Sequence, residues 1–569
     1  MKDLYRCLDE YPEEFQRALA EAWHIPLPED DPLQRVKQLG EGMLAAEALM
    51  AMLEALSPGA QQALAYLQSV GGAAPARTLA MRFGEVRRFG PAGLRREQPW
   101  LAPTSPLEEL YYRGLVYRAF GTVDEAVGEL YMVPTQLYAR LPALEALSFR
   151  ASIAEAKPQG DVVSQSDTLV EDVMAEVVQL RRQPLRLPAD IEFHPQIANR
   201  LALGARMRGP ASPKRLHLLW RVLCNQELVQ HGGKQWHVTL QTRRWLGQSD
   251  GEQWLACFLA WRNDRSWDEL YDLEAIACDR RACPNEPWAA RQRLCGMLLD
   301  LIGPWYDLDS FIAAVRQHHP DYLRPDGDMD SWVIRDAASG EFIRGMGDWD
   351  RVEGALLKEL ISGPLHWLGI IDLAQDRDGR PILRVSEHGA ELLAEMPPHT
   401  DTPPAAEPIA TLDSHLFLSA RTGQSRYQRY QVERLAVWQE QDAQQAHYRL
   451  TEDSIWQALN AGITHEQILS FLQRITGHGV PEIATRLLDA WGRRFGAVSL
   501  RRVVLLEARD AATMRQIRQQ LGSTHLLGTV LDATRCLVDE DNMEPLVAAL
   551  KRRGMWPRIT RPEQKTGGS

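Results

Sequence analysis

Apolar residues recur at helical spacing through most of this chain and alternate with polar residues in only a few short stretches. The first run, which includes Leu4, Leu8 and Phe15, continues as far as Pro26. A recurrence every three to four residues places side chains on one face of a helix, so residues 1–56 are predicted to be helical. The whole pattern predicts a mainly helical α+β fold with small sheets.

The middle of the chain reads as three modules in which helices precede a pair of strands. In residues 57–155, Ser57 can cap a helix that ends at Gly71, and helices are expected near 76–83 and 106–113. Two strands around Gly121 would then form a wing, the order that a winged helix requires. Residues 185–350 are predicted to be a second, basic winged-helix-like module with a helical extension. Residues 351–397 form a third, with a hairpin turn at Asp378.

Two polar segments interrupt this series and are predicted to be linkers. Residues 156–168 contain Pro158 and Gly160, and residues 397–408 contain five prolines. Beyond them, residues 410–557 form a C-terminal α/β domain, followed by a polar tail at 558–569. Helix caps are expected at Thr451 and Thr464.

The end of the C-terminal domain alternates between strands and helices. Strands are expected at 497–506 and 535–538, and helices at 511–521 and 543–553. The two strands should lie in one small sheet covered by the two helices. The apolar run Val503–Leu506 shows no alternation, which predicts a strand that is buried on both faces or that caps a helical core.

Charge is distributed unevenly along the chain. The formal net charge is -12, but residues 200–245 carry nine basic residues and one acid, a local balance of +8. Tryptophans lie between these basic residues, and affinity for phosphates depends on concentrated Lys and Arg. The predicted nucleic-acid-binding residues are Arg206, Arg208, Lys214, Arg215, Arg221, Lys234, Arg243 and Arg244. The alternative is an ordinary solvated face with tryptophans in the core.

No catalytic signature is recognised in the sequence. A phosphate-binding loop needs Ser or Thr after its Gly-Lys pair, whereas Gly233-Lys234 is followed by Gln235. The segment 247–251 resembles the nucleophile turn of hydrolases, but Ser249 with Glu252 reads better as a helix capping box. We therefore expect no enzymatic activity and no cofactor.

Cysteine and hydropathy patterns bear on metals, membranes and compartment. The chain has seven cysteines, and Cys278 and Cys283 have no second pair at the spacing that structural zinc prefers. Buried thiols in a reducing cytoplasm are the expectation, and no metal site is predicted. The longest apolar stretch is broken by Lys358, Glu359 and His366, which excludes a membrane span there.

Residues 448–557 resemble a known domain. The run Tyr448-Arg449-Leu450-Thr451, the segment 454–462 and Val480-Pro481 look like the N-terminal domain of XPB-type helicases, which also occurs in bacterial proteins described as helicase-associated. The resemblance implies DNA-linked work. In the eukaryotic relatives this region docks onto a partner subunit of the transcription and repair factor TFIIH. The motor lobes of those helicases are not recognised in this sequence.

Three hypotheses remain open on the sequence alone. The first is a non-catalytic DNA-associated accessory protein, with winged-helix modules on nucleic acid and a C-terminal domain docked on a protein partner. A separately encoded helicase, or a repair or transcription factor, would be such a partner. The second is a protein-interaction scaffold that does not bind DNA. The third is an enzyme of unrecognised class.

Overall fold

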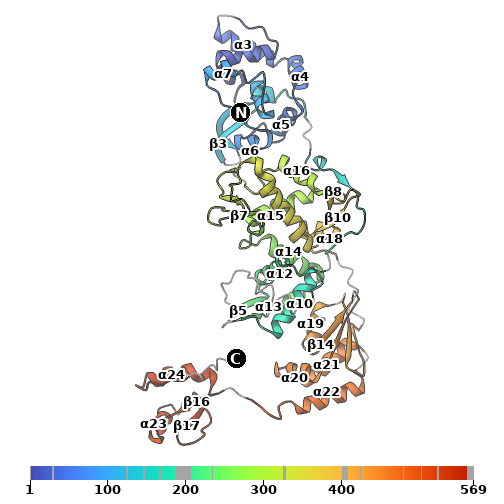
Figure 1. Ribbon diagram of the computed structural model, residues 1–569, viewed down its shortest axis with the longest axis vertical. Helices are drawn as coiled ribbons and strands as arrows, with labels where there is room; N and C mark the ends of the chain where they lie inside the picture. Colours follow the sequence, from blue (N-terminus) through green and yellow to red (C-terminus); the bar gives the residue numbers. More distant parts are fainter. Residues whose placement is uncertain are drawn as a thin grey trace. The chain divides into compact units, whose positions relative to one another are not determined.

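The computed structural model describes residues 2–28, 31–123, 126–144, 148–165, 168–186, 207–232, 235–324, 328–399, 408–422, 425–442, 444–477, 480–500, 503–521 and 525–560 (Figure 1). The chain divides into two compact units, unit 1 (residues 1–405 and 423–431) and unit 2 (residues 406–422 and 432–569). Helices predominate among the described residues, and their sheets are small and antiparallel. This confirms the mainly helical α+β fold.

Unit 1 begins with helices that share one hydrophobic core with a three-stranded sheet. The elements are α1 (Leu4–Asp9), α2 (Glu13–Ala22), α3 (Pro32–Met43), α4 (Ala46–Glu54), α5 (Pro58–Ser69), β1 (Ala73–Pro75), α6 (Ala76–Phe83), α7 (Pro91–Glu97), α8 (Pro106–Tyr112), β2 (Tyr117–Val123), β3 (Ala126–Met132) and α9 (Thr135–Tyr138). The Ser57 hydroxyl accepts the Ala60 amide and caps α5, as the sequence predicts. The sheet order is β1-β3-β2, and its two long strands extend further than predicted.

The next part of unit 1 contains a helix that sequence analysis missed. The elements are η1 (Arg150–Ser152), β4 (Glu155–Ala156), α10 (Leu169–Arg182), α12 (Pro213–Asn225), β5 (Val229–Gly232), β6 (Gln235–Val238), α13 (Gln241–Leu246) and α14 (Asp250–Arg262). In α10 even Asp172 and Glu176 are buried, although the apolar residues of this helix recur at helical spacing in the sequence. Residues 187–206, where the sequence predicts a new domain to begin, lie outside the described residues.

The last part of unit 1 surrounds a four-stranded sheet. The elements are η2 (Glu269–Asp272), β7 (Ile276–Cys278), α15 (Pro287–Leu299), β8 (Trp305–Asp307), α16 (Leu308–His318), β9 (Ile334–Asp336), η3 (Met346–Asp348), η4 (Asp350–Gly354), α17 (Ala355–Leu360), η5 (Ile361–Leu365), β10 (Ile371–Gln375), β11 (Pro381–Val385) and α18 (Glu387–Leu393). The order β10-β11-β8-β4 includes the predicted hairpin. The helix that precedes this hairpin is kinked at Gly363, and its helical turns continue to Leu365.

The segment predicted to be the first linker belongs to this sheet. Strand β4 pairs with β8, which places Ala156 opposite Trp305. Further along, Val163 exchanges backbone hydrogen bonds with Leu373 of β10. Residues 155–163 are therefore fixed by main-chain pairing, and the linker prediction is wrong for them. Pro158 and Gly160 interrupt regular strand structure in this stretch, but the residues around them stay hydrogen-bonded to the sheet.

Unit 1 contains three segments in which helices precede a pair of strands and an earlier stretch of backbone pairs with the second strand of that pair. The first repeat (58–132) has its strands in the order β1-β3-β2. In the third repeat (287–385), β8, β11 and β10 have the same relation. In the second repeat (169–238), Leu185 pairs with Trp236 of β6, and β6 pairs with β5. In each repeat the earlier stretch of backbone therefore lies beside the second strand of the pair.

Unit 2 begins with a four-stranded sheet in the order β12-β13-β15-β14. Its elements are β12 (Ala410–Leu412), β13 (Phe417–Arg421), β14 (Val437–Gln441), β15 (Gln445–Arg449), α20 (Glu452–Asn460), α21 (His465–Thr476) and α22 (Glu482–Arg494). Capping boxes at Thr451 and Thr464 start α20 and α21, which confirms both predicted caps. Helix α19 (Arg426–Glu433) precedes β14, and its residues up to 431 belong to unit 1.

The remainder of unit 2 is a strand-helix-strand-helix segment with its own small core (Figure 1). It consists of β16 (Val503–Glu507), α23 (Ala511–Leu521), β17 (Arg535–Asp539), η6 (Glu540–Asn542) and α24 (Met543–Lys551). The predicted pairing of the two strands is confirmed. The first of the two alternatives for β16, burial on both faces, is wrong, because Val503 is 37% and Leu505 49% exposed.

None of the described helices combines the length and the apolar character that a bilayer crossing requires.

Candidate functional site

The predicted nucleic-acid-binding residues do not form one surface. Arg206 and Lys234 lie outside the described residues. The other six are divided between the segment before α12, α12 itself and α13. They are Arg208, Lys214, Arg215, Arg221, Arg243 and Arg244.

Arg215 is a core residue. Its side chain has no exposed surface, and its guanidinium donates to Asp172 of α10 across 2.5 Å. The same carboxylate accepts the backbone amides of Arg208 and Gly209. The ion pair therefore fixes the segment that leads into α12. It leaves Arg215 unavailable to a phosphate, contrary to its predicted role.

The other two basic residues of α12 are paired with acids of unit 1. Lys214 lies 2.9 Å from Glu359 of α17, and Arg221 lies 2.7 Å from Asp264. Because its neighbours occupy its outer face, α12 does not present the row of free cations that the sequence predicts. Any contact of these two residues with phosphate would require breaking an ion pair.

Arg243 and Arg244 are different. Both are exposed in the last turn of α13, while Trp245 and Leu246 of the same helix are buried. No acid among the described residues forms an ion pair with either arginine. Of the six described candidates, these two present their charge most openly to solvent.

The helix preceding the strand pair is covered in all three repeats. In α8, Glu108 is fully buried and accepts hydrogen bonds from Arg87 and Thr104. In the third repeat, the acid Glu353 just before α17 is buried against Arg324. A winged helix commonly inserts this helix into the major groove. Here the surrounding protein excludes that mode of contact.

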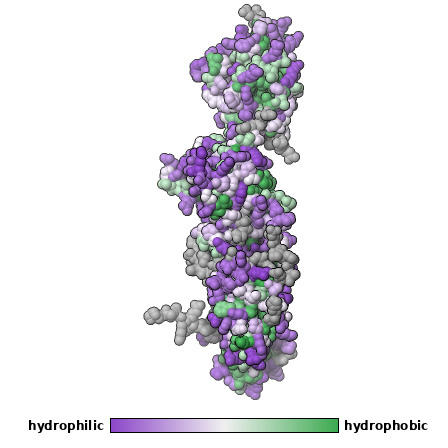
Figure 2. Space-filling model, turned by 90° about the vertical axis from the view of Figure 1, so that its right-hand side faces the viewer, coloured by the Kyte–Doolittle hydropathy of each residue, from purple (hydrophilic) through white to green (hydrophobic). Residues whose placement is uncertain are grey.

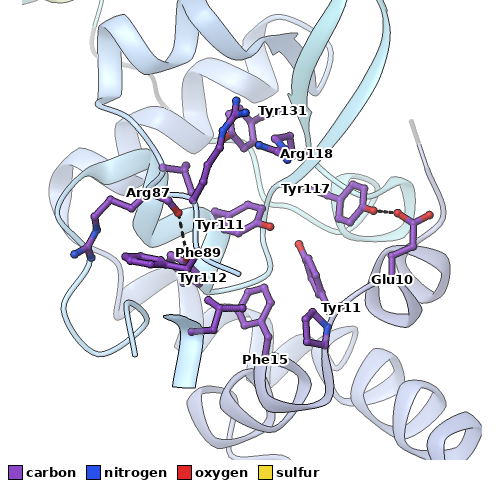
Figure 3. Close-up of a pocket in the computed structure, with 14 residues that line it drawn as sticks. Glu10, Tyr11, Phe15, Arg87, Phe89, Tyr111, Tyr112, Tyr117, Arg118 and Tyr131 are labelled. Atoms are coloured by element: carbon purple, nitrogen blue, oxygen red, sulfur yellow. Dashed lines mark hydrogen bonds between the residues drawn. The ribbon is translucent and has the colours of Figure 1, made fainter. Parts of the chain in front are cut away.

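An aromatic pocket of about 280 Å³ lies in the N-terminal part of unit 1 (Figure 3). Its walls come from the α1–α2 turn, the segment before α7, the end of α8, and strands β2 and β3. Seven rings contribute to the lining: Tyr11, Phe15, Phe89, Tyr111, Tyr112, Tyr117 and Tyr131. Sequence analysis noted neither the pocket nor its tyrosines, which meet only when distant segments pack together.

Most polar groups of the pocket are already paired. Tyr117 donates to Glu10, Arg88 lies 2.7 Å from Glu129, and Arg87 lies 2.8 Å from Glu108. Two groups are not. The Tyr11 hydroxyl is buried without a hydrogen-bond partner among the described residues, and no described acid pairs with Arg118.

Burial controls the ionisation of the pocket phenols. It raises the pKa of Tyr11 well above its usual value and that of Tyr131 to about 12, while the positive charge of Arg118 lowers the pKa of Tyr131 somewhat. The hydroxyls are therefore neutral at pH 7 and act as hydrogen-bond donors and acceptors. Arg118 supplies the unpaired charge.

Unit 2 exposes apolar residues at several places, which include a pocket and a strand face. Trp456, Trp491 and Phe495 line a pocket of about 400 Å³ between α20 and α22. Val503 and Leu505 form an open face on β16. On the side of the molecule shown in Figure 2, hydrophobic residues otherwise form small patches among hydrophilic ones.

The hydrolase-like motif at Ser249 has a structural explanation, whereas Gly233-Lys234 lies outside the described residues. Ser249 forms the expected capping box with Glu252 at the start of α14. All seven cysteines are free. Within the described part of the chain, no group of three His, Cys, Asp or Glu side chains is placed to hold a metal ion.

Comparison with known proteins identifies one region. Residues 410–532 match the family model described as "Helicase conserved C-terminal domain". This match begins at β12 and includes the four-stranded sheet, α20 to α22 and the first strand and helix of the last segment. A search of curated proteins found no match. The C-terminal region of this chain is therefore helicase-related.

Proposed function

We propose that this chain is a non-catalytic accessory protein of a helicase-dependent DNA process. It contacts nucleic acid through α13, which directly follows the second repeat, and docks a protein partner, such as a separately encoded helicase, through unit 2. The match over residues 410–532 carries this proposal, because it links the chain to helicases. We also propose that the C-terminal region is related to XPB-type helicases in particular and that the chain lacks their motor lobes.

The repeated connectivity of unit 1 supports the winged-helix interpretation. Helices followed by a pair of strands, with an earlier stretch of backbone beside the second strand of the pair, is the arrangement expected of such modules. Because the helix before the strand pair is covered in each repeat, nucleic acid would have to contact another surface. Arg243 and Arg244 are exposed and are followed by the buried Trp245 and Leu246, which hold α13 in place. Exposed arginines such as these can bind DNA phosphates without reading the base sequence.

A non-enzymatic role is consistent with one strongly perturbed acid of unit 1, Glu171. The pKa of Glu171 is lowered to about 2 because, against the effect of burial, Arg429 and Arg426 stabilise its carboxylate. Both arginines bond it directly. This cluster is closed and satisfied, unlike a catalytic group that must meet a substrate.

Binding of the full-length protein to duplex and single-stranded DNA tests the nucleic-acid part. Affinity measured at several salt concentrations should fall linearly on a double-logarithmic plot, because bound cations release counterions from the phosphates. Absence of binding to either DNA at low salt would refute this part. A helicase motor recovered with the tagged protein, and lost when unit 2 is altered, would support the docking part.

One observation favours a second candidate function, the protein-interaction scaffold. All three helices that could enter a DNA groove are covered, and the net charge is -12. The scaffold predicts that charge reversal at Arg243 and Arg244 leaves cellular function intact. Loss of function with an unchanged fold would favour the nucleic-acid proposal.

A further inference from the structure

The aromatic pocket in unit 1 contains a buried hydroxyl that the protein itself does not satisfy. Tyr11 is 9% exposed, and its hydroxyl has no partner among the described residues. In Figure 3 this hydroxyl points toward the space between Tyr111 and Tyr117. Buried polar groups are nearly always hydrogen-bonded in folded proteins. A ligand atom in the pocket would supply the missing bond.

Arg118 gives the pocket an uncompensated positive charge. The other two arginines of the lining are held by acids, Arg87 by Glu108 and Arg88 by Glu129. Arg118 lies on β2 beside Tyr131, at one side of the pocket (Figure 3). Among the described residues no carboxylate neutralises it. An anionic group of a ligand can therefore pair with this guanidinium without displacing an internal partner.

The walls between these two polar points are aromatic. Phe15 and Tyr111 have centroids 5.9 Å apart and an interplanar angle of 26°, and Tyr11 lies 4.4 Å from Phe15. A cavity that holds benzene has a volume of about 150 Å³. At about 280 Å³, this pocket has room for one ring and a further small group. A planar ring with an attached anion matches both its shape and its charge.

We propose that the pocket binds one unpaired nucleotide of a single-stranded nucleic acid. The base lies among the rings with its edge at the Tyr11 hydroxyl, and a phosphate oxygen pairs with Arg118. Aromatic side chains bind bases without sequence preference because every base has a π-face. This inference rests on the proposed function, since it names the form of nucleic acid that the protein holds.

A nucleotide in a continuous duplex cannot enter the pocket. The lining is formed by protein on several sides, so a base has to leave its stack before it reaches Tyr11. Strand separation by a helicase produces unpaired bases. The pocket therefore fits an accessory protein that holds the separated strand.

The test uses the full-length protein, a labelled ten-nucleotide thymidine oligomer and fluorescence anisotropy. Arg118→Gln should weaken binding about tenfold, the loss expected for a charge-assisted hydrogen bond. Tyr11→Phe should weaken it about threefold while raising the melting temperature, because the substitution removes a buried unsatisfied hydroxyl. Arg6→Gln is the matched control for charge, since Arg6 is exposed on α1 outside the pocket. Wild-type affinity in both pocket variants would overturn the proposal.

A calorimetric titration identifies the ligand class. Thymidine monophosphate should bind more tightly than thymidine or inorganic phosphate, and Arg118→Gln should remove the advantage of the monophosphate. Binding of benzoate with no binding of the nucleotide would show an aromatic carboxylate site and overturn the proposal.

The same assays separate this proposal from the proposed function. If duplex binding depends on Arg243 and Arg244 but the pocket variants bind the oligomer normally, only the pocket assignment fails. If the monophosphate binds through Arg118 but the protein shows no affinity for duplex, the pocket assignment stands and the α13 surface fails.

Discussion

Arg215 donates to Asp172 across 2.5 Å, and neither side chain has any exposed surface. Arg215 lies in the most basic stretch of the sequence, yet it bonds an acid of a different helix. Taking two charges out of water is costly, so such a pair persists only with good geometry and further hydrogen bonds. The backbone amides of Arg208 and Gly209 provide those bonds.

The first prediction concerns this ion pair. Arg215→Ala should destabilise unit 1 by about 3–5 kcal/mol, because Asp172 is left buried without its cation. Urea unfolding of the full-length protein measures the change. Lys214→Ala is the control and should cost about 1 kcal/mol or less, since the Lys214–Glu359 pair is partly exposed. An Arg215→Ala protein of unchanged stability and impaired DNA binding would contradict the structural role.

Local sequence signals predicted much of the fold. The caps at Ser57, Thr451 and Thr464 and the hairpin at Asp378 depend on residues a few positions apart, and the structure confirms them. Helix α10 was missed although its apolar residues recur at helical spacing.

The candidate site was harder to predict because it depends on long-range pairing. Asp172 and Arg215 are 43 positions apart, and Glu171 and Arg429 are 258 apart. Charge counted along the sequence cannot show that a distant acid neutralises a cation. The pocket likewise joins Tyr11 to strands more than a hundred residues later.

The second prediction concerns the buried acid Glu171. Its pKa falls from an ordinary 4.5 to about 2, because Arg429 and Arg426 outweigh the opposing effect of burial. A lowered folded-state pKa gives stability that is present above pH 4.5 and is lost as the pH falls toward 2.

Arg429→Ala should therefore cost about 3 kcal/mol in unfolding free energy at pH 7, and the difference from wild type should shrink as the pH falls below 4.5. Chemical unfolding at several pH values measures it. Exposed Arg493→Ala, on α22, serves as the control. A penalty that stays constant down to pH 2 would show that Arg429 stabilises the protein by packing alone.

The third prediction concerns His217. Burial beside Trp267 and, to a smaller extent, the nearby positive charge of Arg221 together lower the pKa of this imidazole from 6.5 to about 4. Because the unfolded chain takes up the proton more readily, the stability it contributes is full above pH 6.5 and is lost as the pH falls to 4.

His217→Gln should accordingly flatten the pH dependence of the melting temperature between pH 6.5 and 4. The substitution of exposed His415 in unit 2 should leave that dependence unchanged. Identical profiles for wild type and His217→Gln would mean that the imidazole is not held neutral by the fold.

The fourth prediction concerns partner docking. The outer edge of β17 is already bonded to residues 528–531, whereas no described backbone pairs with the outer edge of β16. Leu505 is 49% exposed on this strand. A free edge with apolar side chains is suited to adding a partner strand.

Val503→Lys with Leu505→Lys should keep the melting temperature within a few degrees of wild type, because both side chains face solvent. It should reduce capture of the partner helicase severalfold. The matched change at Ile483, exposed on α22, should not. Undiminished capture would exclude the β16 face as the docking surface.

Arg243 and Arg244 offer the most direct test of the nucleic-acid claim. Duplex affinity should be measured against salt for wild type, for Arg243→Glu with Arg244→Glu, and for the control Arg515→Glu with Arg518→Glu on exposed positions of α23. If α13 meets phosphates, the first double variant loses affinity at every salt concentration, and its double-logarithmic slope falls by about 2, while the control keeps the wild-type slope. Equal affinity and equal slope in wild type and the α13 variant would contradict the claim.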